Sequence, residues 1–389
     1  MYKLLALVLV LAILIPALPV VAKTKVTGFE EGVSAADLRA AYADGTVRIL
    51  IVPGHEPGYG GAVYQGVYER EINVEIADEL ARLLRQNPTY DVIVARTNLA
   101  WHEDLAEYFD EEMRATKRFV TDQKKLMSKL VRRGDVEQRG DGEQVDHAAA
   151  PTDVALRLYG INRWANENDV DLVLSLHVND APDHDENTPS AHSGFALYVP
   201  DAHYGNAEAS RAVAEPLFAR LTKLNATSTL PGESAGIVED QELIAIGAYG
   251  TLTVPSILVE YAYITESRFT HPEVRKTVTD DFAYQTYLGV QDFFGVPTPS
   301  RYPTRSLPFT FGGTPVVGSS SPAAYSLQAG LRTLGFYPTA TSTLTDCPVS
   351  GLMGICTVGA INAFQKSMGF EQTGALGPKT RAALQTALP

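Results

Sequence analysis

Three short runs rich in Val, Ile and Leu, at 47–53, 170–176 and 255–259, are almost uninterrupted by polar residues. Such runs predict strands that are buried on both faces of a sheet. A fourth strand is predicted at 90–96. Between the first two of these strands, apolar residues recur at helical spacing from Glu69 onward, which predicts a helix beginning there. The pattern is that of an open α/β sheet.

Each of the three apolar runs ends on a side chain suited to chemistry. His55 follows the first run, His177 ends the second and Glu260 ends the third. Ligands of open α/β sheets bind outside the carboxyl ends of the strands, so we expect these side chains to converge there. Glu69 begins the helix after the first strand and is expected beside His55. Two histidines and one glutamate leave a coordination position open for water, as in catalytic zinc sites.

With these residues placed, the chain resembles the zinc-dependent N-acetylmuramoyl-L-alanine amidases (type 3), which cleave peptidoglycan. The resemblance covers roughly residues 47–295. It departs from the family pattern at Glu56-Pro57, where two glycines are usual, at Ala262 in place of Gly, and at Glu266, where Asn is common. The matching motifs, in order, are Pro53-Gly54-His55, Gly66-Val67-Tyr68-Glu69 with Asn73, Ser175 to Asn179, Ser193-Gly194, and Leu258-Val259-Glu260-Tyr261-Ala262-Tyr263.

The resemblance implies an α/β fold with a mixed, mostly parallel sheet flanked by helices. It implies one Zn²⁺ per catalytic domain, with Glu260 as the catalytic base. Glu71 and Glu75 lie further along the same helix and are alternative ligands to Glu69. Candidates for contacting substrate are Asn179 and His192, and the implied metal ligands are His55, Glu69 and His177.

The stretch 98–152 matches no part of the family pattern. Apolar residues from Leu105 to Leu130 keep a roughly heptad spacing, which predicts a helix of nearly thirty residues. One interpretation is a lid or a docking element for a protein activator beside the cleft. The other is a helix packed on the flank of the domain.

Six prolines and a Gly-Ser run between 296 and 322 predict a linker. The segment 323–389 is similar to the small three-helix peptidoglycan-binding domain, through its Leu327-Gln328, Phe364-Gln365 and Thr373-Gly374 phrases. The two cysteines of the chain, Cys347 and Cys356, are expected to form a disulfide in an oxidising compartment.

The N-terminus bears on where the protein works. Residues 4–22 form an uncharged apolar stretch after Lys3, which predicts a signal peptide at 1–22, followed by a lead-in at 23–46. The alternative is an uncleaved membrane anchor, because the stretch is nearly of bilayer length. Either interpretation predicts a protein that is secreted or held in the cell envelope. A net charge of −14 argues against a nucleic-acid partner. The partner that the resemblance implies is peptidoglycan.

Two other functions stay open from the sequence. One is a wall-binding protein that has lost catalysis, and the other is a zinc peptidase that cuts within the stem peptide. The remaining histidines show no ligand spacing and are expected on the surface; they are His102, His147, His184, His203 and His271.

Overall fold

The computed structural model describes residues 29–139, 145, 147, 149–181, 184–297 and 312–388. The expected signal segment 1–22 and most of the expected linker lie outside this part of the chain. Within it, no helix combines the length and the apolar character needed to cross a membrane. The lead-in before the first strand contains helix α1 (Ala35–Asp44), which Ser34 caps at its N-terminus.

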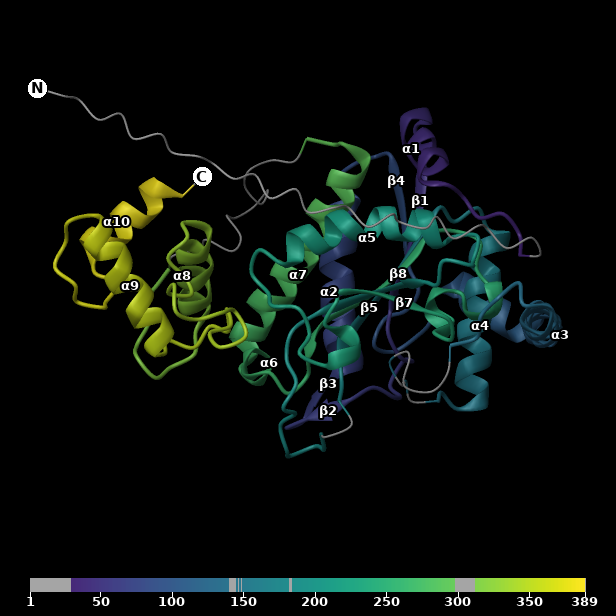
Figure 1. Cartoon of the computed structure of the whole chain (residues 1–389), viewed down its shortest axis with the longest axis horizontal. Helices are drawn as coiled ribbons and strands as arrows, with labels where there is room; N and C mark the ends of the chain where they lie inside the picture. Colours follow the sequence, from purple (N-terminus) through teal and green to yellow (C-terminus); the bar gives the residue numbers. More distant parts are fainter. Residues whose placement is uncertain are drawn as a thin grey trace, which may run out of the picture.

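A six-stranded mixed sheet forms the centre of the catalytic region (Figure 1). Four strands are parallel neighbours and two complete one edge, where β6 runs antiparallel to β8 and parallel to β7. The predicted mostly parallel sheet is therefore confirmed. In spatial order the strands are β4 (Tyr90–Val94), β1 (Val47–Pro53), β5 (Leu172–Asn179), β8 (Ser256–Tyr263), β6 (Ala196–Pro200) and β7 (Ile237–Asp240).

Helices cover both faces of this sheet. One face is covered by α2 (Glu69–Leu84), α5 (Ala207–Leu221) and α7 (Pro272–Phe294), whose apolar side chains join those of the strands in the largest core cluster. The other face carries α4 (Thr152–Glu167). The remaining elements are the hairpin β2 (Val63–Tyr64) and β3 (Val67–Tyr68), helix α6 (Ser267–Thr270), and the 3-10 turns η1 (Pro231–Glu233), η2 (Ile244–Ile246) and η3 (Ala248–Gly250).

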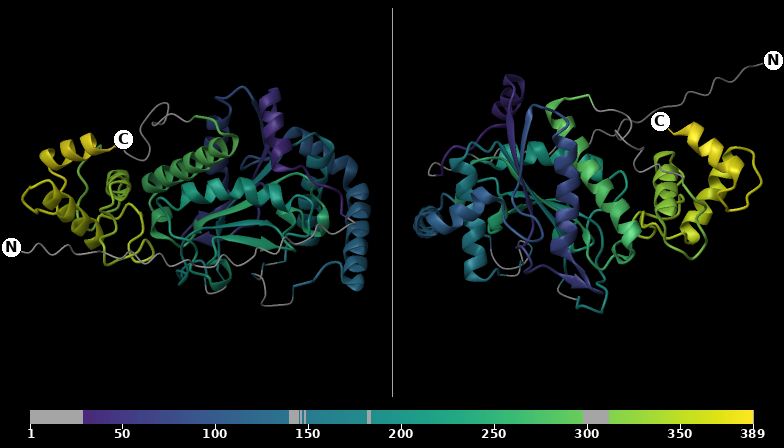
Figure 2. Two further views of the ribbon diagram at one scale, coloured as in Figure 1. Left: turned by 45° about the horizontal axis from the view of Figure 1, so that its top comes forward. Right: turned by 180° about the vertical axis from the view of Figure 1, so that it is seen from behind.

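The long helix predicted within 98–152 is α3 (Glu103–Arg133), with 31 residues. Leu105 and Phe109 pack with Trp164 of α4 in a core cluster beneath the sheet. Arg163 of α4 pairs with the carboxylate of Glu112 at 2.9 Å. The helix thus lies along the flank of the domain, outside α4, as Figures 1 and 2 show.

Three helices make up the C-terminal module, as predicted: α8 (Pro322–Thr333), α9 (Ile355–Ser367) and α10 (Pro378–Ala387). The disulfide between Cys347 and Cys356 is formed and ties the loop after α8 to the start of α9. Gln328 and Gln365, the glutamines of the expected phrases, are buried and hold loop backbone through hydrogen bonds.

The module packs directly against the catalytic region (Figure 1). The Tyr325 hydroxyl donates to Asp281 Oδ2 of α7 at 2.8 Å, and both side chains are buried. Arg332 Nε donates to the carbonyl of Lys223 at 3.1 Å. Gly351 approaches Val274 so closely that an added Cβ would lie 2.9 Å from a valine methyl. The apolar residues of the two parts form one continuous cluster.

Burial raises the pKa of Asp281 to about 6, although the hydrogen bonds from Gln285 and Tyr325 lower it in part. This value is above the roughly 3.9 expected in the unfolded chain, so the folded protein binds the proton more tightly. Asp281 therefore makes its full contribution to the free energy of unfolding below about pH 4. That contribution is lost as the pH rises through about 6.

We predict that Asp281→Asn removes this dependence. The unfolding free energy of the unmodified protein should fall, relative to that of the variant, by up to about 3 kcal/mol between pH 4 and pH 7. Denaturant unfolding across that range measures the difference. Asp110→Asn, at an exposed position of α3, is the matched control. A difference between Asp281→Asn and the unmodified protein that does not change with pH would contradict the prediction.

Candidate metal centre

The first candidate ligand, His55, leaves β1 in a tight turn. The backbone φ of His55 is +69°, in the left-handed region that residues other than glycine rarely adopt. Glycine is required just before it, because a Cβ on Gly54 would lie 2.2 to 2.5 Å from ring atoms of His177. The Gly54 N–H donates to the Leu176 carbonyl at 2.8 Å, which joins the turn to β5. The two histidines are thereby brought together, with ring centroids 5.1 Å apart.

Glu69 is the first residue of α2, and its side chain is buried among donors. Its Oε2 accepts the Ala62 N–H at 3.0 Å, and its Oε1 accepts Nδ2 of Asn73, one helical turn on, at 3.2 Å. The pairing of Glu and Asn four residues apart thus has a structural reason. The residue as a whole is 4% exposed.

His55, Glu69 and His177 each direct a ligand atom into one small space. Glu69 Oε2 lies 2.6 Å from His55 Nε2, and Glu69 Oε1 lies 3.0 Å from His177 Nδ1. One atom from each residue lies within 4.8 Å of the others, and these three could hold a metal ion. Within the described part of the chain, no other group of three such side chains comes as close. His55 Nε2 is buried, and its close contact with Glu69 lacks the geometry of a hydrogen bond, as expected of two atoms that a metal would bridge.

The two histidines determine the charge state of Glu69. Burial raises the pKa of Glu69, but the charge of His55 and the hydrogen bond from His177 outweigh burial and hold the pKa well below its usual range. Burial lowers the pKa of His177 in spite of Glu69. An ionised carboxylate and neutral imidazoles are the forms that bind metals.

Glu260 lies on β8 directly beside His177, because the two residues are register partners. Burial raises the pKa of Glu260 well above its usual range, and the carboxylates of Glu69, Glu233 and Asp180 raise it further. Its Oε2 is buried with no hydrogen-bond partner. A carboxylate with a free oxygen and a raised pKa is suited to accepting and returning a proton.

Glu233, in η1, is a buried carboxylate that the sequence did not single out. It accepts hydrogen bonds from the Tyr198 hydroxyl at 2.6 Å and from the Tyr263 hydroxyl at 2.7 Å. The Asn179 amide donates to both of its oxygens, at 2.8 and 3.1 Å. The amide nitrogen of Asn179, a candidate for contacting substrate, is thus held by Glu233. Glu233 could not be identified from the sequence, since a lone Glu after Pro-Gly belongs to no motif.

Arg96 was also missed, although it ends the predicted strand 90–96 at the edge where His55 lies. The residue is 1% exposed and donates to four backbone carbonyls, among them those of Pro53, Gly54 and Arg70. It therefore joins the turn before His55 to the first turn of α2. Its position beyond β4 is a signal that could have identified it.

The other candidates are placed as follows. His192 packs near the Tyr263 ring, with centroids 6.0 Å apart. Glu71 is exposed, and Glu75 approaches Arg275 of α7 at 3.7 Å, so neither joins the cluster.

The expected surface position is wrong for His184 and His203. Their side chains are only 5% and 8% exposed. Asp180 and Asp201, respectively, accept hydrogen bonds from the two rings, which makes the burial of an imidazole possible.

One departure from the family pattern also has a structural explanation. Glu266 Oε1 accepts the N–H groups of Gly194 and Tyr263, at 2.9 and 3.1 Å. Arg268 pairs with the other oxygen at 2.8 Å. Glu266 thereby joins the Ser193-Gly194 motif to the end of β8.

Comparison with known proteins assigns two parts of the chain to known families. The family model of N-acetylmuramoyl-L-alanine amidase matches residues 49–292, and that of a peptidoglycan binding domain matches residues 320–384. No curated protein gives a significant match.

Three solved structures illustrate the similarity, each given with sequence identity, TM-score, and the shares of this chain and of the other that are covered. The first is the CwlD amidase from Clostridioides difficile in complex with the GerS lipoprotein, at 13% identity and a TM-score of 0.42, with 65% of this chain and 100% of the other covered. The second is the catalytic domain of the amidase CwlV from Bacillus (Paenibacillus) polymyxa, at 17% identity and a TM-score of 0.40, with 65% of this chain and 100% of the other covered. The third is the amidase Ami1 from Mycobacterium smegmatis, at 15% identity and a TM-score of 0.40, with 64% of this chain and 97% of the other covered.

The assignment rests on the family model, which spans well over half of the chain. This chain belongs to the N-acetylmuramoyl-L-alanine amidase family, whose members hydrolyse peptidoglycan, and it carries a C-terminal peptidoglycan-binding domain.

Proposed function

We propose that this amidase uses a zinc ion held by His55, Glu69 and His177, with Glu260 as the general base. The bond cleaved is the amide between the lactyl group of N-acetylmuramic acid and L-alanine of the stem peptide. The observation that supports this best is the meeting of three ligand atoms beside a buried carboxylate with a free oxygen.

The donor set suits zinc. Two imidazole nitrogens and one carboxylate oxygen, from three separate elements, are the ligands of catalytic zinc sites in hydrolases. Bound zinc would supply Lewis acidity, which polarises a carbonyl and makes water more acidic. The Asn73 amide and the Ala62 N–H orient the Glu69 carboxylate from behind, as outer-shell partners do.

Glu260 performs the proton transfers in this proposal. Its free Oε2 takes the proton of the attacking water and then delivers it to the nitrogen of the leaving L-alanine. Three side chains donate hydrogen bonds to the two oxygens of Glu233, which lies behind Glu260. Glu233 adds to the raised pKa of Glu260, which favours the first proton transfer.

The C-terminal module would hold the enzyme on peptidoglycan and raise the local concentration of its substrate. Since peptidoglycan lies outside the cytoplasm, we place the protein in the envelope or among secreted proteins. Residues 1–22 would serve as the export signal, or as an anchor if they remain uncleaved.

The products of digestion test the cleaved bond. Mass spectrometry of digested peptidoglycan should find intact stem peptides that begin with a free L-alanine amine. Peptides cut internally would indicate a stem-peptide peptidase instead. No soluble product would indicate a wall-binding protein without catalysis.

The metal and base roles are separable by substitution. His55→Ala, Glu69→Ala and His177→Ala each remove a ligand, so zinc content and activity should fall together. Glu260→Gln keeps the shape but cannot accept a proton. It should therefore retain about one zinc per chain while turnover falls by two to four orders of magnitude, the usual effect of losing a positioned base.

The controls are His271→Ala and Glu71→Gln, which change exposed residues outside the cluster. Both should keep zinc and activity. Loss of zinc from Glu260→Gln would make Glu260 a ligand, and full activity in that variant would overturn the mechanism.

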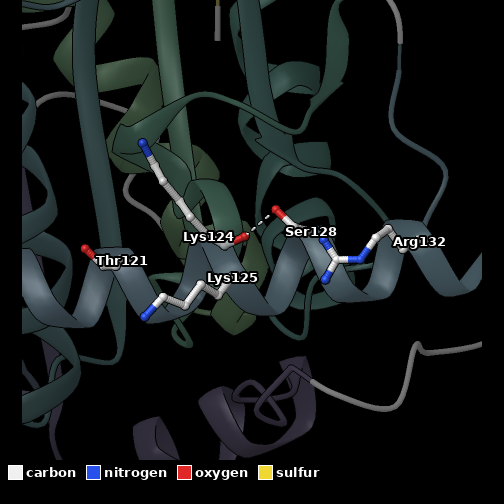
Figure 3. A pocket seen from close by; sticks show the side chains of 5 residues that line it. All are labelled: Thr121, Lys124, Lys125, Ser128 and Arg132. Carbon is white, nitrogen blue, oxygen red and sulfur yellow. Dashed lines mark hydrogen bonds between the residues drawn. The ribbon is translucent and has the colours of Figure 1, made fainter.

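We further propose that α3 docks an acidic protein partner. Residues 103–112 carry six acidic and no basic side chains, whereas residues 114–133 carry eight Lys or Arg and a single acid, Asp122. All eight basic residues are exposed, on a chain whose net charge is −14. A shallow depression on this basic half is lined by Thr121, Lys124, Lys125, Ser128 and Arg132 (Figure 3).

Charge reversal tests this docking surface. An extract of the cell envelope should stimulate hydrolysis of purified sacculi by the unmodified enzyme, and the triple variant Lys125→Glu, Lys129→Glu, Arg132→Glu should lose the stimulation. Basal hydrolysis without extract should be unchanged, because these residues lie outside the metal cluster. Glu107→Lys, on the acidic half, is the control. Equal stimulation of the triple variant would exclude the basic half as a docking site.

A further inference from the structure

The turn that carries His55 is closed by few bonds of its own. The N–H of Glu56 donates to the Tyr59 carbonyl at 3.2 Å, and the Tyr59 N–H returns a bond to Glu56 at 3.3 Å. Gly58 and Gly60 in this turn have positive φ angles, as His55 does. A backbone conformation of this kind persists only where the surroundings impose it.

The side chain of Glu56 supplies such a restraint. Both of its oxygens accept from the Arg157 guanidinium, Oε1 from Nε and Oε2 from a terminal nitrogen at 2.8 Å. The two side chains are only 14% and 25% exposed. A two-bond contact between a planar guanidinium and a carboxylate fixes orientation as well as distance. Arg157 also pairs with Asp153, one turn earlier on α4, at 2.9 Å.

Arg157 is an effective restraint because α4 itself is firmly held. Asn162 donates to the Ile244 carbonyl at 2.7 Å, and Trp164 packs in the core cluster beneath β1 and β5. Arg163 pairs with Glu112 of α3 at 2.9 Å. The guanidinium of Arg157 therefore extends from a rigid element to a turn that is not part of the sheet.

The residues that precede His55 in the same turn are held by Arg96, whose guanidinium donates to the carbonyls of Pro53 and Gly54. Arginines from two different places in the fold therefore restrain the chain immediately before and immediately after His55. The restraint after His55 depends on the side chain of Glu56. The family usually has glycine at this position, and a glycine could form no such pair with arginine.

We propose that Arg157 is a positioning residue, which holds the His55 turn through Glu56 and so sets the affinity of the site for its metal. Arg157 restricts the conformations of the His55 turn before the ion binds. The turn therefore loses less conformational entropy on metal binding. The inference rests on the proposed zinc site and adds a determinant of its affinity.

The test is zinc affinity, measured at equilibrium by competition with a chelator on the metal-free full-length protein. Arg157→Gln and Glu56→Gln should each weaken zinc binding by about 10- to 100-fold, the range for lost outer-shell partners. Turnover at saturating zinc should stay within a few-fold of the unmodified enzyme, since no ligand or proton-transfer group is removed. The double exchange Glu56→Arg, Arg157→Glu should recover part of the affinity.

Arg220→Gln is the matched control, because Arg220 of α5 makes the same kind of two-bond pair with Asp292 of α7, away from α4 and the metal cluster; it should leave zinc affinity unchanged. Thermal unfolding of each metal-free variant separates a positioning role from general loss of structure. Should Arg157→Gln fail to fold, Glu56→Gln decides alone. Equal zinc affinity in folded Glu56→Gln and the unmodified protein would overturn the inference. An unmodified protein that binds no zinc would instead overturn the proposed function.

Discussion

The catalytic region depends on burying one carboxylate, that of Glu69. Removing a charged group from water is costly unless donors surround it. Here the polar groups around Glu69 come from the turn after β1, from β5, from α2 and from the segment before β2, so all of these must meet at one point. Gly54 permits that meeting, because a side chain there would occupy the space of the His177 ring. The arrangement of the sheet edge follows from two requirements: the buried Glu69 carboxylate must be surrounded by polar groups, and the His177 ring needs the space beside Gly54.

Much of this edge was predictable from the sequence. Apolar runs reveal buried strands, and their last residues must lie at the carboxyl edge, so His55, His177 and Glu260 could be placed before the structure was known. Helical spacing placed the start of a helix near Glu69, and the resemblance, through Gly66 and Asn73, favoured Glu69 over Glu71 and Glu75. The positions of these side chains depend on local pattern and on sheet topology, both of which the sequence encodes directly.

The side chains that hold these candidate site residues in place were not predictable in the same way. Glu233 and Arg157 act through contacts between elements 54 and 101 residues apart in sequence, with Asn179 and Glu56 respectively. Such contacts depend on how helices and loops pack, which periodicity does not report. The same limit explains the wrong placement of His184 and His203, because a histidine without ligand spacing can still be buried by a neighbouring aspartate.

The docking of the C-terminal module also has a consequence for how the enzyme would sample its substrate. A module on a free tether lets a catalytic cleft explore every bond within the reach of the tether. Because Tyr325 donates a hydrogen bond to Asp281 and one apolar cluster runs through both parts, the metal centre stays at a constant distance from the C-terminal module. The bonds that are cleaved would then be those lying at a fixed distance and orientation from the point where the module binds the polymer. The repeat of the wall itself, more than diffusion of the enzyme, would set where each bond is opened.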